Sequence, residues 1–418
     1  MLPVSSSTGN PTNFVDAFFT SVSATCVTGL TVVETGLHWS VFGKCIILLL
    51  IQTGGLGFMS VALMFSVVAR RRITPRERLI FAQSINITDL SGIVKFAKLI
   101  FYGTLALELL GAIILAFRFI PEFGVPEGIF NSVFHSVSAF CNAGFDILGR
   151  GNSVCDYATD PLVSLVISLL VVFGGLGFFV WRDLFMFFKY KHRLSPYSKI
   201  VLLTTTVLLV SGTLFLFLFE YNNPVFDNFS GGELLLTSFF QSAVTRTAGF
   251  FSVDLSSLTS PSKALSMLLM FIGGASGSTA GGIKVASFAV IIVAMISILK
   301  GKSKFVIFKR NIALNDVLRA MGIFAVALLI VTTSCFFICL IDPQFSFTEI
   351  LYEVISAFAT VGQTLGITAD LSIISKFVLC LLMFFGRVGI ITVTYAIMFN
   401  QARSENLISY PDTNIFIG

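Results

Sequence analysis

The sequence predicts an all-α integral membrane protein in which one structural unit is repeated four times around a central axis. Three observations predict this fold class. The composition is that of a membrane protein, a short glycine-containing phrase occurs four times at similar intervals, and the basic residues gather between the occurrences. Together they indicate a pseudo-fourfold assembly within a lipid bilayer.

Apolar residues dominate the composition. Of the 418 residues, 55% are hydrophobic and 12% are charged, whereas soluble globular chains carry roughly 25% charged residues. The seven cysteines form no CxxC pair or zinc-ligand spacing, so we expect neither disulfides nor a redox role. Several apolar stretches exceed the ~18 residues that indicate a spanning helix, among them Val41–Ala69, Leu162–Phe188, Lys199–Phe219 and Val317–Ile341.

A polar phrase that ends close to a glycine recurs along this apolar chain. It reads SVSATCVTGL at 21–30, SVSAFCNAGF at 136–145, QSAVTRTAGF at 241–250 and VISAFATVGQ at 354–363. The shared glycines are Gly29, Gly144, Gly249 and Gly362, at intervals of 115, 105 and 113 residues. One such phrase alone would be interpreted as an ordinary turn in which glycine ends a helix. Four at this spacing indicate a repeated unit instead.

A short apolar segment precedes each phrase. These segments are Phe14–Ala24, Ile129–Ala139, Glu233–Val244 and Glu349–Ala359. Helices of about 11 residues cannot span a hydrocarbon core ~30 Å thick, so we expect re-entrant half-helices. A long apolar helix follows each phrase, and another precedes the second, third and fourth half-helices. The expected unit is therefore helix, pore half-helix, filter loop, helix.

The expected repeats divide the chain at its polar linkers. They are repeat 1 (1–72), repeat 2 (73–193), repeat 3 (194–304), repeat 4 (305–403) and a C-terminal tail (404–418). About 13 residues precede the first half-helix, so no opening helix is visible for repeat 1, and either the chain lacks that span or the sequence begins downstream of the natural start. We expect seven full spans and four half-helices, where a regular fourfold design has eight spans.

Charge placement predicts the orientation in the membrane. The segments that lead into the half-helices are acidic, as at Glu127, Asp227 and Asp342, and the linkers between repeats are basic. By the positive-inside rule the linkers are cytoplasmic and the half-helices enter from outside. The net charge of +5 is thus a topology signal, and we expect no nucleic-acid partner. The basic linker residues are Arg70, Arg71, Arg72, Arg76, Arg78, Lys189, Lys191, Arg193, Lys199, Lys300, Lys302, Lys304, Lys309 and Arg310.

The four phrases are expected to line a central pore. Non-helical backbone at membrane depth must be buried in protein or line a water-filled path. Glycine permits backbone angles that a side chain penalises, so carbonyl oxygens can turn inward. Rings of carbonyls replace the hydration shell of a cation, and the half-helices direct the negative ends of their dipoles at it. The expected filter residues are Val27, Thr28, Gly29, Asn142, Ala143, Gly144, Thr247, Ala248, Gly249, Thr360, Val361 and Gly362.

A second glycine pattern lies in the helix after each phrase. GGLG occurs at 54–57 and at 174–177, and we interpret both copies as close helix packing through small residues. The third copy expands to FIGGASGSTAGGIK at 271–284, which cannot sustain an ordinary helix, so an unwound segment is expected there. The fourth copy, GRVG, places Arg387 in mid-span. A charge there indicates a function, and a structural arginine bonded to carbonyls is the alternative.

Two other charged residues stand out in apolar surroundings. Arg246 lies beside the third phrase, and we interpret it as an anchor for the half-helix, paired with an acidic neighbour. Glu108 lies within an apolar helix and is expected to face a neighbouring helix or water. The three histidines are scattered, and no catalytic or phosphate-binding set is visible in the sequence, so the chain is not expected to be an enzyme.

The motifs SATCVTGL, SAFCNAGF, TRTAGF and FATVGQT together resemble the filter segments of the Trk/Ktr/HKT potassium-transporter superfamily. The likeness covers nearly the whole chain and is greatest to the membrane subunit of Ktr systems. It implies a pseudo-fourfold pore for potassium uptake, with sodium dependence or sodium permeation in many members. Glycine at all four filter positions resembles the potassium-preferring pattern.

The resemblance also implies a gate and partners. The gate residues would be Gly273, Gly274, Ala275, Ser276, Gly277, Ser278, Thr279, Ala280, Gly281 and Gly282, with Arg387 lining the pore below the filter. The implied partners are a second copy in a homodimer and a cytosolic nucleotide-binding RCK subunit of the KtrA type, in the inner membrane of a bacterium. Potassium, and sodium with it, would be transported, with no organic cofactor in this chain. A sodium-permeable uniporter of the same fold and a coupled secondary transporter, which would also use broken helices, remain as alternatives.

Overall fold

The computed structural model describes residues 1–57, 93–148, 153–302 and 304–389. Within these ranges, three helices are long and apolar enough to cross a membrane, or four if one bent pair is counted as a single span. The three are α6 (Ile93–Phe123), α10 (Pro196–Glu220) and α14 (Leu314–Ile341). The last two contain the stretches 199–219 and 317–341 that composition predicts as spans.

The long helices present apolar side chains outward. On α10, Leu203, Val207, Val210 and Leu214 are each more than half exposed. A contiguous apolar surface of this kind is unfavourable in water and favourable against lipid chains. The chain is therefore a membrane protein, as its composition predicts.

Four short helices lie where the half-helices are expected. They are α1 (Phe14–Cys26), α7 (Val125–Phe140), α11 (Gly231–Val244) and α15 (Phe347–Ala359). The starts of α11 and α15 carry capping boxes, in which Ser230 pairs with Glu233 and Ser346 with Glu349. Such caps satisfy the first amides of a helix at a polar boundary. The helices α6, α10 and α14 pack along α7, α11 and α15, respectively.

Two of the helices that follow the phrases are broken. The stretch Leu162–Phe188 forms α8 (Pro161–Gly175) and α9 (Phe178–Tyr190), which meet at 98°. The prediction of one continuous span there is wrong, because Gly177 has a φ of +86°, which ends the helical path. The helix after the third phrase is divided into α12 (Ser260–Phe271) and α13 (Val285–Leu299), as its glycine content predicts.

The helices after the first and fourth phrases are α3 (Val41–Leu56) and α16 (Ile373–Val388). The second half of the expected span 41–69, the arginines of the first linker and the tail 404–418 lie outside the described residues. All seven cysteines are free. Short helices complete the chain: η1 (Pro3–Ser5), α2 (Thr35–His38), η2 (Cys155–Tyr157), η3 (Pro224–Phe226), η4 (Leu255–Ser257) and η5 (Thr368–Asp370).

A small antiparallel sheet departs from the all-α prediction. Strands β1 (Phe305–Ile307) and β2 (Arg310–Ile312) form a hairpin between α13 and α14. Its turn residues Phe308 and Lys309 both have positive φ values, which matches the twist of a tight two-residue turn. The fold is otherwise helical in the part of the chain that the structure describes.

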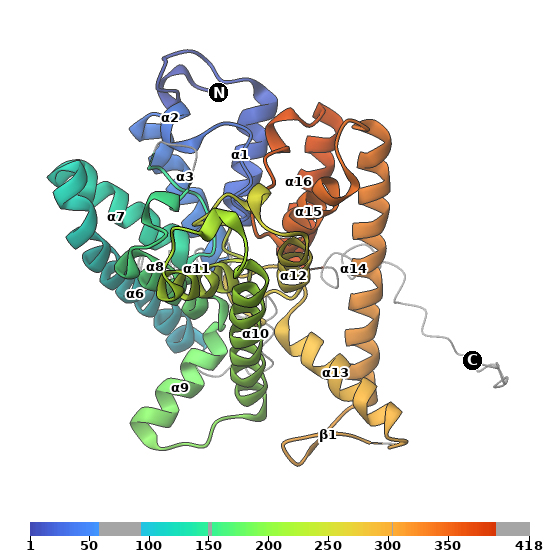
Figure 1. Ribbon diagram of the computed structural model, residues 1–418. Helices are drawn as coiled ribbons and strands as arrows, with labels where there is room; N and C mark the ends of the chain where they lie inside the picture. The colour runs from blue at the N-terminus through green and yellow to red at the C-terminus, as the bar shows by residue number, and fades with distance from the viewer. Residues whose placement is uncertain (58–92, 149–152, 303, 390–418) are drawn as a thin grey trace.

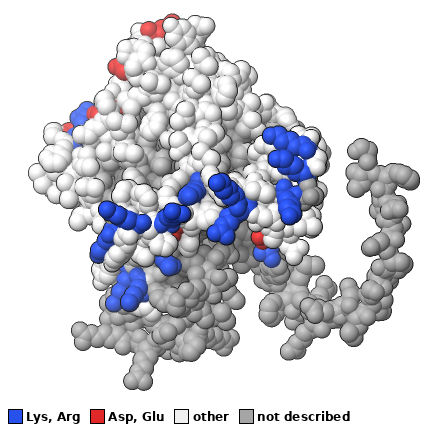
Figure 2. Space-filling model, turned by 90° about the horizontal axis from the view of Figure 1, so that it is seen from below, with Lys and Arg blue, Asp and Glu red and all other residues white. Residues whose placement is uncertain are grey.

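The described basic linkers lie at one end of the molecule. Lys189 and Lys191 are at the end of α9, and Lys309 and Arg310 are in the hairpin. Figure 1 shows α9 and the hairpin at its lower end, opposite the N-terminus. Seen from that end, Lys and Arg far outnumber Asp and Glu on the described surface (Figure 2).

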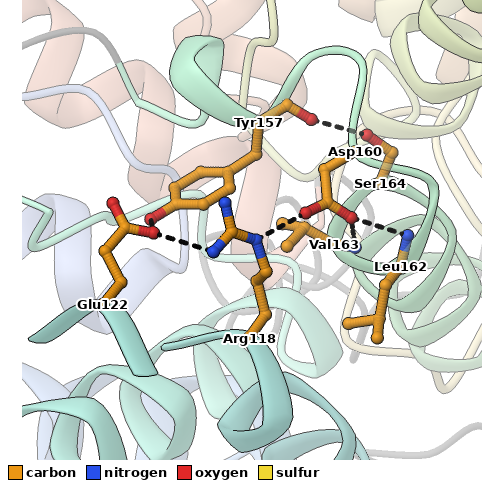
Figure 3. A network of polar contacts seen from close by, with 7 residues as sticks. All are labelled: Arg118, Glu122, Tyr157, Asp160, Leu162, Val163 and Ser164. Carbon is orange, nitrogen blue, oxygen red and sulfur yellow. Dashed lines mark hydrogen bonds and ion pairs between the residues drawn. The ribbon is translucent and has the colours of Figure 1, made fainter. Parts of the chain in front are cut away.

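A polar network joins the C-terminal end of α6 to the start of α8 (Figure 3). Arg118 Nε donates to Asp160 Oδ2 at 2.8 Å, and Arg118 also lies 3.2 Å from Glu122 Oε2. Tyr157 donates to Glu122 at 2.8 Å, and Asp160 caps α8 by accepting from Leu162 N at 2.9 Å. Single exposed ion pairs contribute roughly 0–1 kcal/mol. Their combination with a helix cap holds the two helix ends together.

Candidate functional site

The four glycine phrases meet in a closed ring. Each phrase glycine lies against the carbonyl oxygen of the residue before the glycine of another phrase, so closely that a Cβ would clash with it. The pairs are Gly29 with Ala143, Gly144 with Ala248, Gly249 with Val361, and Gly362 with Thr28. They join phrase 1 to 2, 2 to 3, 3 to 4 and 4 back to 1. The recurrence of glycine therefore has a steric reason, because no side chain fits at these four positions.

The backbone of each phrase is left-handed at two positions. The phrase glycines have φ values between +67° and +94°. The residues two positions earlier are also left-handed, namely Val27 (+58°), Asn142 (+60°), Thr247 (+88°) and Thr360 (+51°). For β-branched residues this conformation is an outlier, and it costs on the order of 1–3 kcal/mol. Strain that is repeated at the equivalent position of four loops indicates that the loop geometry is needed for function.

A serine six residues before the glycine holds three of the four loops. The carbonyls of Ser23, Ser138 and Ser356 accept from the amide that precedes the glycine, at 2.8, 2.7 and 2.9 Å. The hydroxyls of Ser23 and Ser356 also accept from the glycine amide, both at 3.1 Å. The Ser138 hydroxyl donates instead to the Phe145 carbonyl at 2.7 Å. Sequence reasoning missed this role, although phrases 1, 2 and 4 share a Ser-Ala pair whose serine lies six residues before the glycine.

The loop carbonyls are left without donors because the loop amides bond back to the half-helices. In the described ranges, the oxygens of Thr28, Ala143 and Val361 accept no hydrogen bond from the protein, whereas that of Ala248 accepts from Phe250 N at 2.8 Å. These oxygens lie at the C-terminal ends of four half-helices, where the helix dipoles are negative. Such an arrangement suits a cation and disfavours an anion.

Side chains link neighbouring phrases as well. The Asn142 amide and Thr247 Oγ1 are hydrogen-bonded at 3.0 Å, which joins phrases 2 and 3. Gln363 Nε2 donates to the Phe250 carbonyl at 2.9 Å, which joins phrases 4 and 3, and Gln363 also accepts from the buried Tyr352 at 3.1 Å. Hydrogen bonds between polar side chains therefore hold neighbouring phrases of the ring together. The sequence alone does not show which of these side chains are paired.

Glycines of the following helices pack against the ends of the half-helices. A Cβ at Gly54, Gly174 or Gly386 would clash with the carbonyl oxygen of Thr25, Phe140 or Phe358, respectively. Each of these carbonyls lies four residues before the glycine of its phrase. The interpretation of GGLG as close helix packing is confirmed for its first glycine in both copies. At 174–177 the motif also breaks the helix.

The glycine-rich segment of the third repeat, 272–284, folds as a loop against the α8–α9 break. Ala275 N donates to Gly175 O at 2.9 Å, and Phe178 N donates to Gly277 O at 2.9 Å. The loop also reaches the phrases, since Thr279 Oγ1 donates to the Phe140 carbonyl at 3.2 Å. The loop thus lies next to the ring, and the bend in the second repeat provides its docking surface.

Arg387 joins this loop to the first repeat. Its guanidinium donates to the carbonyl oxygens of Thr279 in the loop and Gly54 in α3, and to that of Gly55 at 3.0 Å. The bonding to carbonyls agrees with the structural alternative for Arg387. Because one of the carbonyls belongs to the loop, the same contacts also control where the loop lies.

The two other charged residues contact neighbouring helices. Arg246 donates to the Thr205 carbonyl of α10 at 3.4 Å. Its expected pairing with an acidic residue is wrong within the described part of the chain, because α10 presents backbone rather than a carboxylate there. Glu108 of α6 accepts from Gln52 Nε2 of α3 at 3.1 Å, so it faces a neighbouring helix.

Acidic residues follow three of the phrase glycines within five positions. Glu34 and Asp254 lie five residues after Gly29 and Gly249, and Asp146 lies two residues after Gly144. Burial of the Asp146 carboxyl and the charge of Glu34 raise the pKa of Asp146 to about 6. Negatively charged carboxylates that follow the phrase glycines attract cations to the side of the ring on which they lie.

Comparison with known proteins identifies the family. The family model for TrkH, a cation transport protein, matches residues 3–407. The chain belongs to this family. The expected resemblance to the Trk/Ktr/HKT superfamily is thereby confirmed.

Several relatives match the TrkH-family chain over its full length. The potassium/sodium uptake protein NtpJ of Enterococcus hirae is 39% identical over 420 residues, covering 100% of this chain and 92% of its own. The Ktr system potassium uptake protein B of Bacillus subtilis is 38% identical, with the same coverage of both chains. The crystal structure of the potassium transporter TrkH from Vibrio parahaemolyticus matches with a TM-score of 0.72 and 20% identity, covering 93% of this chain and 79% of its own. That structure shares the fold.

Proposed function

We propose that this TrkH-family protein takes up potassium ions across the membrane through a gated pore within one chain. It would act as the ion-conducting subunit of a Ktr-like system. The observation that carries the proposal is the closed ring of glycine–carbonyl contacts among the four phrases. Carbonyl oxygens without protein donors replace the water that a potassium ion loses on entry. The full-length relatives named for potassium uptake support the choice of ion.

The filter in this proposal consists of residues 27–29, 142–144, 247–249 and 360–362. Each phrase provides one glycine in the ring, so the number of ordered ion sites is small and discrimination between potassium and sodium is modest. A sodium-permeable uniporter of the same fold is the second candidate. One relative is named as a potassium/sodium uptake protein, and this name supports the second candidate.

The loop at 273–282 and Arg387 form the gate in this proposal. The loop contacts the end of α7 and the α8–α9 break, and Arg387 bonds to it from α16. The positive charge of Arg387 raises the barrier to cations. Displacement of the loop would remove both obstacles.

Transport requires no chemical reaction in this chain. One elementary charge that crosses 100 mV gains about 2.3 kcal/mol, which corresponds to a concentration ratio of about 50. The membrane potential is therefore sufficient to accumulate potassium. A coupled secondary transporter would instead move a second solute in fixed stoichiometry.

The orientation and partners follow from the charge distribution and from the relatives. We infer that the basic end seen in Figure 2 faces the cytoplasm of a bacterial cell and the ring opens outward. A cytosolic nucleotide-binding RCK subunit would bind the basic face, and two copies of the chain would form a homodimer. The Ktr system names of several relatives support a multi-subunit assembly.

Growth rescue tests the function. The full chain is expressed in a bacterium that lacks its own potassium uptake systems, at micromolar potassium, with and without sodium. We expect growth and rubidium uptake above those of the empty-vector strain, and sodium dependence would appear as a difference between the two media. Protein in the membrane without growth or rubidium uptake would contradict the proposal. A fixed ratio to a second solute in reversal-potential measurements would favour the secondary transporter.

A further inference from the structure

The residue that follows each phrase glycine is buried, and its chemical type changes in the fourth phrase. The four residues are Leu30, Phe145, Phe250 and Gln363, and each is at most 1% exposed. Burial of an amide among apolar side chains is unfavourable unless the amide forms hydrogen bonds. A glutamine at a position that is apolar in the other three repeats therefore needs a specific reason.

A second polar residue occurs in the same repeat and contacts the glutamine. Ten positions before the phrase glycine, the first three repeats have phenylalanine and the fourth has Tyr352. Tyr352 is fully buried, and its hydroxyl donates to Gln363 Oε1 at 3.1 Å. The amide nitrogen of Gln363 donates in turn to Phe250 O in the third phrase at 2.9 Å. The two departures from the repeat pattern are therefore one hydrogen-bonded unit, which joins the fourth half-helix to the third phrase.

The third phrase lacks the serine that holds the other three. The residue six positions before its glycine is Ala243. In the second phrase the serine at this position, Ser138, donates to Phe145 O at 2.7 Å. The equivalent carbonyl of the third phrase is Phe250 O, and its donor is the Gln363 amide. Gln363 thus provides, from the fourth phrase, the hydrogen bond that a serine provides within the second.

Phe250 is joined directly to the ring. Its amide donates to Ala248 O at 2.8 Å, and that oxygen lies against Gly144. The backbone of the third phrase also differs from the others, since Thr247 has a φ of +88° and the equivalent residues lie between +51° and +60°. A loop without its own serine bond depends more on contacts from its neighbours. The position of Phe250 therefore affects the position of one oxygen of the proposed filter.

We propose that Gln363 is a positioning residue for the third filter segment, with Tyr352 as its support. The proposal rests on the proposed function of the ring as a potassium filter. Loss of the Gln363 amide leaves the buried Phe250 carbonyl without this donor, and the Ala248 oxygen becomes free to shift. A filter whose oxygens can shift adapts more readily to the smaller sodium ion, so discrimination in favour of potassium falls.

The test measures rubidium uptake by the full chain in proteoliposomes, with sodium as the competing ion. We expect Gln363→Leu, which introduces the residue of the first phrase, to lower rubidium-over-sodium discrimination about fivefold, a change that corresponds to about 1 kcal/mol. Tyr352→Phe should lower it by a smaller factor. The double variant should resemble Gln363→Leu alone, because the hydroxyl acts through the glutamine.

A serine at position 243 provides the rescue. Ala243→Ser, added to Gln363→Leu, introduces a hydroxyl at the position from which Ser138 bonds in the second phrase. We expect it to recover most of the lost discrimination, which it could not do if the glutamine only filled space. Gln344→Leu is the matched control, because Gln344 is exposed and its amide donates to Asp342, outside the ring. Its discrimination should equal that of the wild type.

Folding of each variant is followed by thermal melting in detergent. A folded Gln363→Leu with wild-type discrimination overturns the proposal, as does an equal loss in Gln344→Leu or the absence of rescue by Ala243→Ser. If Gln363→Leu does not fold, Gln363→Met is measured under the same criteria, and failure of both to fold shows a purely structural glutamine and also overturns it. A wild type that excludes rubidium refutes the pore itself, whereas a conducting wild type with an unchanged Gln363→Leu refutes only the role of Gln363.

Discussion

Substitution of Gly249 by alanine tests the ring directly. Gly249 has a φ of +69°, and a Cβ there would clash with the Val361 carbonyl and lie 3.1 Å from the Cα of Gly144. The new methyl group therefore pushes on the third, fourth and second phrases at once.

The size of the effect follows from two contributions. Alanine in the left-handed region costs roughly 1–2 kcal/mol. In addition, the Val361 oxygen has to move by about 1 Å, and a misplacement of that size in a preorganised site can reduce a rate about 10²-fold. We expect potassium uptake to fall by about two orders of magnitude.

The assay is growth rescue at micromolar potassium together with initial rates of rubidium uptake. Gly301→Ala is the control, because Gly301 has a φ of +63° and no atom within 4 Å of the position of a Cβ. It carries the same left-handed penalty without the clash. Uptake by Gly301→Ala should equal that of the wild type. Near-normal uptake by a folded Gly249→Ala would refute the filter assignment.

Other perturbations test the gate, the loop support and the topology. Arg387→Ala, or deletion of Ala275–Ala280, should raise rubidium flux several-fold if the loop obstructs the pore, and unchanged flux counts against gating. Ser356→Ala removes a hydrogen bond to the filter glycine worth about 1 kcal/mol, so potassium-over-sodium discrimination in flux competition should weaken about fivefold; full discrimination would show that the serine is dispensable. Cysteines at Lys302 and Glu127 should react with impermeant reagents from the inside and the outside, respectively, and the reverse pattern would overturn the orientation.

Local features of the sequence were sufficient to locate the half-helices. The half-helices end within two residues of their expected ends because helix termination at a phrase depends on the neighbours along the chain. The ends of α11 and α15 at Val244 and Ala359 coincide with the prediction. The unwound stretch in the third repeat is likewise a local consequence of glycine and serine content. For the same reason, the family could be recognised from four short motifs.

The break between α8 and α9 shows where local reasoning failed. The stretch 162–188 is uniformly apolar, and GGLG alone does not distinguish a packed helix from a broken one. The bend of 98° places Gly175 O and Phe178 N where the loop from repeat 3 bonds to them. Its partner lies about 100 residues away, so the reason for the break is absent from the neighbouring sequence.

By itself, the sequence determined that this protein is a membrane protein with four short helices, each ending in a glycine phrase, because composition and helix termination act over a few residues. The tertiary structure alone decided that the phrases close a ring in which each glycine meets a carbonyl of another phrase. It also decided that Arg387 bonds to Gly54, 333 positions away, and to the loop. Such contacts depend on how separate helices pack, and packing joins surfaces that no short stretch of chain contains.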